Sequence, residues 1–275
     1  MGFFLIIANI LFSLYGLTST TFFDSYKFEV DRILINKDYK RLITSGFLHV
    51  SWTHLVFNMF SLYAFYGLVE NRLGSLNFSI IYFASLVGGD LLSLYIHRNH
   101  GDYSSVGASG AVCGIIFASI ALFPGMGISF FGLPFSIPSR LYGILYVLYS
   151  IYGIKSKKDN IGHEAHLGGA LVGMTVALLI HPSAFLENYL TILIIVLPTV
   201  AFIYIIIMKP QLLLIDNFYF KTHNHYYSID HKSNEQKHNN EKEIDKILDK
   251  INKAGLNSLT TKERLKLKQY SKKVR

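Results

Sequence analysis

Residues 107–114 read GASGAVCG, and residues 163–173 read HEAHLGGALVG. Each segment contains a pair of glycines four residues apart, and in a helix such positions share one face. In membrane helices, small residues at this spacing let two backbones approach closely. The pairs Gly110/Gly114 and Gly169/Gly173 therefore predict two helices that pack together through glycine faces.

The composition around these segments indicates a membrane protein. Of 275 residues, 51% are hydrophobic and 16% charged, whereas soluble domains carry about 25% charged residues. Residues 1–208 contain 11 Lys/Arg and 10 Asp/Glu, whereas residues 209–275 contain 15 Lys/Arg and 8 Asp/Glu. A near-neutral apolar body with a basic tail predicts a lipid bilayer as its partner and fits poorly to a soluble enzyme, a disordered chain or a nucleic-acid binder. The single cysteine, Cys113, excludes an internal disulfide.

Seven apolar segments are candidate membrane helices: Phe3–Leu17, Leu55–Val69, Leu76–Ile96, Ala108–Phe123, Leu141–Ile154, Leu167–Ile180 and Tyr189–Met208. Backbone groups in lipid must be hydrogen bonded internally, which favours a helical bundle. We predict an all-α membrane protein, a polytopic bundle of six core transmembrane helices plus a seventh, with six spans in all as the alternative. The first segment lacks the basic start and A-x-A site of a signal peptide, so we expect it to be retained.

Hydropathy and charge divide the chain into a transmembrane domain at 1–208, a polar linker at 209–240 and a basic helical-hairpin tail at 241–275. In the tail, Thr260 and Glu263 have the spacing of a capping box. Within the first part, the connection 18–45 is long enough to predict structure or function of its own.

Ser109 begins the fourth apolar segment. A serine at a helix start is ordinarily an N-cap, but polar groups in membrane spans are functional suspects. Gly107 and Gly110 remove side-chain bulk on both sides, so another helix or a substrate backbone can reach the hydroxyl. The segment is not the G-x-S-x-G elbow of hydrolases, because its fifth position is Ala111.

His163 and His166 are three residues apart, whereas the zinc-binding H-E-x-x-H helix needs its histidines four apart. One interpretation places both at a polar membrane boundary. The other follows from Gly169 and Gly173, because close helix packing would bring a histidine to Ser109. An adjacent imidazole activates a serine hydroxyl as its general base.

His54 and Asn58 are four residues apart and share one helix face. They either hold the bundle together through hydrogen bonds or donate to the oxyanion of an acyl-transfer reaction. Successive spans run in opposite directions, so the second, fourth and sixth begin at the same membrane face. His54, Ser109 and His166 begin these spans, which favours the catalytic interpretation.

In this order, HLVFN at 54–58, GASG at 107–110 and AHLGGALVG at 165–173 resemble the rhomboid family of intramembrane serine proteases. ENRLG at 70–74 also looks like a loop signature of that family. The resemblance covers about 41–181, so the segment at 189–208 would be an additional span.

The resemblance implies that Ser109 is the nucleophile and His166 the general base of a dyad without a carboxylate. His54, Asn58 and the backbone N–H of Ser109 would stabilise the oxyanion. The A-H-x-x-G register selects His166 over His163.

Structural roles are implied for Gly107, Gly110, Gly169, Gly173, Glu70 and Arg72. The implied activity is that of a serine endopeptidase acting on transmembrane proteins within or beside their spans, with no cofactor and no metal. The alternative is a non-catalytic rhomboid-like protein that binds transmembrane clients, although such proteins usually lack the serine or the histidine.

Two positions depart from the family pattern. An aromatic residue often stands four residues after the serine and packs on the histidine, but here that position is Cys113, which predicts a less firmly oriented imidazole. The Trp-Arg pair of the first loop is also absent, so we expect Tyr26, Phe28 and Tyr39 to hold the loop.

The resemblance implies a multi-pass protein of the cell membrane with its site outside the cytoplasm and its N-terminus inside. Short cytoplasmic loops are normally enriched in Lys/Arg. The face of the site, however, carries Lys27, Arg32, Lys37, Lys40, Arg41, Arg98, Lys155, Lys157 and Lys158. The opposite face carries Arg72 and Arg140, so charge argues for the reverse orientation.

Overall fold

A computed structural model describes residues 1–123, 125–129, 136–156, 161–208, 244–245, 247–252, 255, 258–260, 262–264 and 266–267. The chain forms two compact units, Met1–Lys221 and Thr222–Arg275. Each unit is described separately below.

The described part of the first unit contains seven long helices, together with short helices and strands. The long helices are α1 (Gly2–Thr18), α5 (Trp52–Leu73), α6 (Ser75–Ile96), α7 (Ser109–Leu122), α8 (Ser139–Ser156), α9 (His163–Ile180) and α10 (Ser183–Met208). All seven predicted segments are thus helical, as expected for an all-α polytopic membrane protein. By length and composition alone, α6, α9 and α10 can each cross a membrane.

Among the helices that begin earlier than predicted, α9 and α10 differ most from their predicted starts. α9 starts at His163 instead of Leu167 because its polar first turn is helical. α10 starts at Ser183 and bends at Asn188, immediately before the predicted start at Tyr189. The Asn188 side chain donates a 2.7 Å hydrogen bond to the carbonyl oxygen of Ile120 in α7, which gives this buried amide a partner at the bend.

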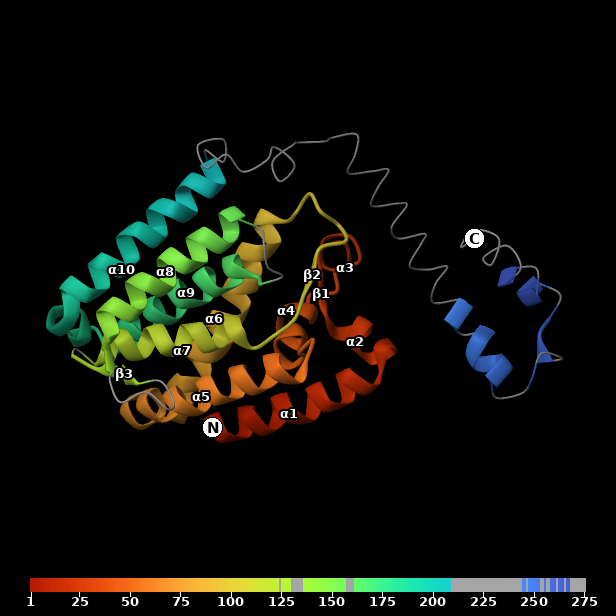
Figure 1. Cartoon of the computed structure of the whole chain (residues 1–275), viewed down its shortest axis with the longest axis horizontal. Helices are drawn as coiled ribbons and strands as arrows, with labels where there is room; N and C mark the ends of the chain where they lie inside the picture. Colours follow the sequence, from red (N-terminus) through yellow and green to blue (C-terminus); the bar gives the residue numbers. More distant parts are fainter. Residues whose placement is uncertain are drawn as a thin grey trace. The chain divides into compact units, whose positions relative to one another are not determined.

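α7 is the central helix, and all of its residues from Gly110 to Leu122 are buried. Figure 1 shows it between α1 and α5 on one side and α8 and α10 on the other. A Cβ built on Gly169 would lie 2.7 Å from the carbonyl carbon of Gly110, and one built on Gly173 would lie 2.6 Å from that of Gly114. Side chains cannot occupy these positions, so the glycine faces of α7 and α9 meet backbone to backbone as predicted.

The long first connection has structure of its own. It contains α2 (Thr20–Tyr26), β1 (Phe28–Glu29), α3 (Val30–Leu34), α4 (Arg41–Thr44) and the 3₁₀ turn η1 (Ser45–Phe47). β1 pairs antiparallel with β2 (Ser104–Ser105), with Phe28 opposite Ser105. This pairing fixes the connection against the strand that leads into Ser109.

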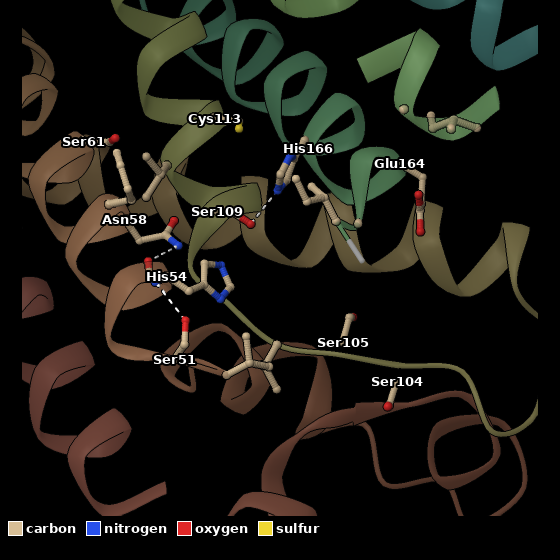
Figure 2. Close-up of a pocket in the computed structure, with 18 of the residues that line it drawn as sticks. Ser51, His54, Asn58, Ser61, Ser104, Ser105, Ser109, Cys113, Glu164 and His166 are labelled. Atoms are coloured by element: carbon tan, nitrogen blue, oxygen red, sulfur yellow. Dashed lines mark hydrogen bonds between the residues drawn. The ribbon is translucent and has the colours of Figure 1, made fainter. Parts of the chain in front are cut away.

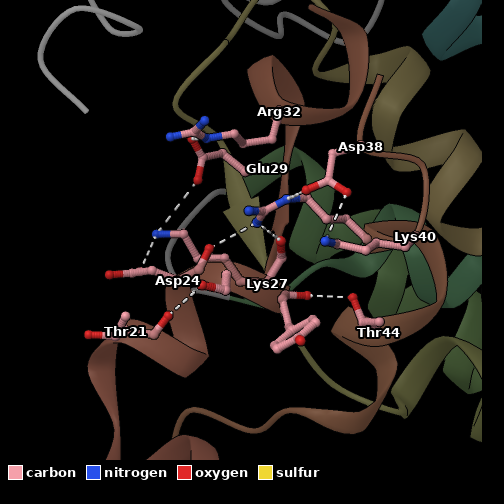
Figure 3. Close-up of polar contacts among 11 residues, drawn as sticks. Thr21, Asp24, Lys27, Glu29, Arg32, Asp38, Lys40 and Thr44 are labelled. Carbon is pink, nitrogen blue, oxygen red and sulfur yellow. Dashed lines mark hydrogen bonds and ion pairs between the residues drawn. The ribbon is translucent and has the colours of Figure 1, made fainter. Parts of the chain in front are cut away.

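Arg41, which was not among the predicted residues, makes the largest set of polar contacts in the connection. Its guanidinium is buried and donates to the carbonyl oxygens of Asp24 and Lys27 at 3.0 and 2.6 Å, and to the Asp38 carboxylate at 2.9 Å. Figure 3 labels these three partner residues. Tyr39 is 56% exposed, so its expected role is wrong.

The other two expected residues do contribute. The Phe28 side chain is fully buried in a small cluster with Val30 and Ile33. Tyr26 contributes its carbonyl oxygen, which accepts a 2.9 Å hydrogen bond from the Thr44 hydroxyl.

The turn-rich link after α7 contains an antiparallel pair, β3 (Gly127–Ser129) and β4 (Ser136–Pro138). Its register places Ile128 opposite Ile137. Ser139, which begins α8, donates its backbone N–H to the Met126 carbonyl oxygen at 2.8 Å. The link therefore joins α7 to α8 without a continuous helix.

The second unit has a small apolar core formed by Ile244, Ile247 and Leu259. The predicted capping box is present, because Glu263 N–H donates to Thr260 Oγ1 at 3.3 Å and Thr260 N–H donates to Glu263 Oε2 at 2.7 Å. The predicted linker, 209–240, lies outside the described residues, so the three-part domain division stays a prediction.

Candidate active site

Ser109 occupies the first position of α7, and Ala108 precedes it as the N-cap residue. The Ser109 hydroxyl instead forms a 2.6 Å hydrogen bond with Nε2 of His166 (Figure 2). His166 lies in the first turn of α9, so the glycine contact between α7 and α9 brings the two side chains together.

His163, the rival histidine, is directed elsewhere. Its side chain is almost fully buried against Gly153 of α8, where a Cβ would overlap the imidazole. Its ring meets that of Tyr149 edge-on, with 5.1 Å between centroids. Of the two histidines, His166 is the one hydrogen bonded to Ser109.

His54 and Asn58 lie one turn apart at the start of α5. Figure 2 shows them on the side of Ser109 opposite His166. All four residues line one cavity of about 960 Å³. Asn58 Nδ2 donates one hydrogen bond, 3.0 Å long, to the His54 carbonyl oxygen.

Gly107 makes room for His54. Its φ of +135° is one that L side chains rarely adopt, and a Cβ there would lie 2.7 Å from Cε1 of the His54 ring. Its N–H donates to the Ser45 carbonyl oxygen at 3.0 Å, and the Ser45 hydroxyl donates to Asp90 at 3.0 Å. The backbone before Ser109 is therefore hydrogen bonded to η1 through Ser45, and Ser45 is in turn hydrogen bonded to α6 through Asp90.

His49 lies beside His54, with 4.9 Å between ring centroids. The Ser13 hydroxyl donates to the Phe47 carbonyl oxygen at 2.9 Å and has one proton, so it accepts from His49 Nδ1–H at 2.8 Å. These contacts fix the His49 tautomer in the wall behind His54.

Glu70 and Arg72 lie at the other end of α5, far from the cavity. The Glu70 carboxylate accepts hydrogen bonds from Gly2 N–H at 2.9 Å and the Ser75 hydroxyl at 2.5 Å. Arg72 Nη2 lies 3.2 Å from Nε2 of His181, at the end of α9. These contacts join helix ends, and neither residue lines the cavity.

Sequence reasoning missed one buried polar cluster at the start of α9, near His166. Glu164 Oε1 lies 2.7 Å from Nε2 of His97 and 2.7 Å from the Tyr103 hydroxyl. The rings of His97 and Tyr103 are stacked with centroids 3.5 Å apart. Burial and the nearby Glu164 carboxylate raise the pKa of Tyr103 well above its usual value. The cluster ties α9 to the segment that leads from α6 to Ser109.

The sequence signal that could have indicated this cluster is the Glu164 carboxylate at the start of a membrane helix, because such a charged group normally has a partner. Its partners come from a distant segment, which spacing alone does not reveal. Among the described residues, no group of three His, Cys, Asp or Glu side chains is arranged to hold a metal ion.

The fold is that of a polytopic membrane protein, and a serine and a histidine from two of its neighbouring helices are hydrogen bonded to each other. Residues 36–183 match the family model of the Rhomboid domain. This is more than half of the chain, and the chain belongs to the rhomboid family. Residues 227–273 match a second model, described as a family of unknown function (DUF6576).

Several curated proteins are similar to this chain. It is 29% identical over 178 residues to Rhomboid protein 1, mitochondrial, of Saccharomyces cerevisiae, covering 60% of this chain and 51% of that protein. It is 31% identical over 162 residues to Rhomboid-like protein 11, chloroplastic, of Arabidopsis thaliana, covering 54% and 55%. It is 24% identical over 199 residues to Rhomboid protease GluP of Bacillus subtilis, covering 71% and 37%. The chain spans about half the length of the curated relatives it matches.

The burial of His49 predicts a pH-dependent stability. Burial, with a smaller effect of neighbouring His54, lowers the pKa of His49 from 6.5 to about 3. Below pH 6.5 the unfolded chain therefore binds a proton that the folded protein does not, so stability falls as the pH falls from about 6.5 toward 3, by about 2 kcal/mol at pH 5.

Thermal unfolding in detergent between pH 7.5 and 4.5 tests this. His49→Gln should be less stable than wild type at pH 7.5, because the packing around Ser13 changes, but should lose less stability on acidification. Equal losses in the two proteins would contradict the assignment.

Proposed function

We propose that this protein is an intramembrane serine endopeptidase that cleaves transmembrane protein substrates. The observation that carries the proposal is the 2.6 Å hydrogen bond between Ser109 Oγ and His166 Nε2 at the wall of a cavity of about 960 Å³. Family membership supports it, as does the similarity to the Bacillus subtilis relative, which is named as a rhomboid protease.

In the proposed mechanism, Nε2 of His166 accepts the hydroxyl proton as Ser109 Oγ attacks the scissile carbonyl carbon. The resulting oxyanion collapses, the C–N bond breaks, and the new imidazolium donates its proton to the leaving amine. His166 then takes a proton from water as the water oxygen attacks the acyl ester. The second oxyanion collapses, the C–Oγ bond breaks, and the imidazolium returns its proton to Ser109 Oγ.

The oxyanion donors we propose are the Ser109 backbone N–H, the His54 imidazole and Asn58 Nδ2. The amide nitrogen of Asn58 has two N–H groups, and only one is needed for its bond to the His54 carbonyl oxygen. Preorganised donors of this kind stabilise charge that develops in the transition state.

The competing function is the binding of transmembrane clients without cleavage. The same cavity would serve it, but binding alone does not need a serine hydroxyl in contact with an imidazole. That contact favours the catalytic proposal.

Substitution of the dyad tests the activity. Ser109→Ala and His166→Ala should each lower cleavage of a model transmembrane substrate by about 10³-fold or more. The first removes the proposed nucleophile and the second removes the proposed general base. His54→Ala should cost about 10²- to 10³-fold through loss of an oxyanion donor. The assay is gel-based cleavage by purified protein in proteoliposomes.

Thr175→Ala is the matched control, because Thr175 is an exposed hydroxyl residue on the same helix as His166 and does not line the cavity. It should cleave at the wild-type rate. Substantial cleavage by folded Ser109→Ala or His166→Ala would refute the dyad.

We also propose that this is a protein of the cell membrane with the site on its extracytoplasmic face, as the family resemblance implies. α9 begins at the face of the site and α10 returns to it, so seven spans would place the tail on that side as well. Protease added outside sealed, right-side-out vesicles should then digest the tail. A tail protected until the vesicles are opened would contradict this orientation.

A further inference from the structure

The position one turn after Ser109 is occupied by Cys113, whose side chain is buried on the same face of α7. Its Sγ atom lies 2.8 Å from the hydroxyl oxygen of Tyr146, a residue of α8. A thiol and a phenol at this distance are hydrogen bonded. The contact therefore joins α7 to α8 beside the dyad.

The Tyr146 ring is near the His166 imidazole. The ring centroids are 6.4 Å apart with an interplanar angle of 35°, within the range of interacting aromatic pairs. Phe117 of α7 also meets the Tyr146 ring edge-on, with 5.6 Å between centroids. Phe117 and Cys113 thus define where the Tyr146 ring lies.

The His163 ring also lies near the His166 imidazole, with centroids 5.9 Å apart and an interplanar angle of 74°. The hydrogen bond to Ser109 fixes one atom of the His166 ring, and neighbouring rings restrict its rotation. A general base must hold such an orientation, because small misplacements of reacting groups cost large factors in rate.

We propose that Tyr146, anchored by Cys113, is a positioning residue that orients the His166 imidazole toward Ser109. An aromatic ring from α8 thereby supplies the contact that an aromatic at position 113 would otherwise make. The inference rests on the proposed function and assigns to Tyr146 no direct contact with the reacting atoms.

A purely structural role for Tyr146 makes different predictions. If the ring only filled space between α7 and α8, its loss would lower stability without a specific effect on turnover. If it contacted substrate in the cavity, its loss would raise KM. A positioning role instead lowers kcat and the intrinsic reactivity of Ser109 together.

The test combines kcat and KM for a transmembrane substrate, the rate of Ser109 labelling by a fluorophosphonate, and thermal stability in detergent. Tyr146→Ala should lower kcat and the labelling rate by about tenfold to a hundredfold, with KM changed by no more than about twofold. Tyr152→Ala is the control, because Tyr152 lies on the same helix and is 58% exposed. It should match wild type.

Two further variants test the anchor. Cys113→Ala and Tyr146→Phe remove the same hydrogen bond, so each should lower kcat by about twofold to fivefold and the double variant should fall no further. These variants keep the ring or the helix contact, so they are informative even where Tyr146→Ala does not fold.

A rescue variant separates orientation from packing. Cys113→Tyr in the Tyr146→Ala protein places an aromatic ring one turn after Ser109, where the vacated volume can accept it. It should recover most of the lost kcat and labelling rate.

Unchanged kcat and labelling in Tyr146→Ala, a change confined to KM, or full additivity of Cys113→Ala and Tyr146→Phe would each overturn the inference. Failure of rescue in a folded double variant would also overturn it. A wild-type protein that neither cleaves nor is labelled at Ser109 would instead refute the proposed function.

Discussion

The backbones of α7 and α9 touch at Gly110 and Gly169, and the position of Ser109 relative to His166 depends on that contact. Any side chain at Gly169 would meet the backbone of Gly110. Hydrophobic burial does not drive helices together in lipid, so close packing of small residues has to do so. The same feature that stabilises the bundle therefore brings a serine and a histidine from distant segments within hydrogen-bond distance.

The rest of the site is built around this helix pair from three directions. The first connection, held by Arg41, adds β1 to the strand before Ser109. Glu164 joins the start of α9 to the end of α6 through His97. Tyr146 reaches in from α8 to Cys113. Each contact joins a separate element to the wall of one cavity. The polar side chains that line this cavity are therefore held in fixed positions within a largely apolar bundle.

Much of this arrangement could be predicted from sequence because its signals are local. Spacing of four residues revealed the glycine faces, and apolar length revealed the seven helices. The roles of individual residues at the site remain proposals, although the geometry brings Ser109, His166, His54 and Asn58 to one cavity. Contacts between distant segments were harder to predict. Arg41, rather than Tyr39, holds the first connection because its guanidinium donates to the carbonyl oxygens of Asp24 and Lys27. No periodicity indicates that Tyr146 would meet Cys113.

In the proposed mechanism, the glycine contact between α7 and α9 sets the reactivity of Ser109, and the most direct test is the rate of Ser109 labelling by a fluorophosphonate. Gly169→Ala should lower that rate by about tenfold or more, since the added methyl group separates α7 from α9. Gly67→Ala on α5 is the control, because a Cβ there would approach only the Asn71 side chain, at 3.9 Å. Labelling of Gly169→Ala at the wild-type rate would contradict the account.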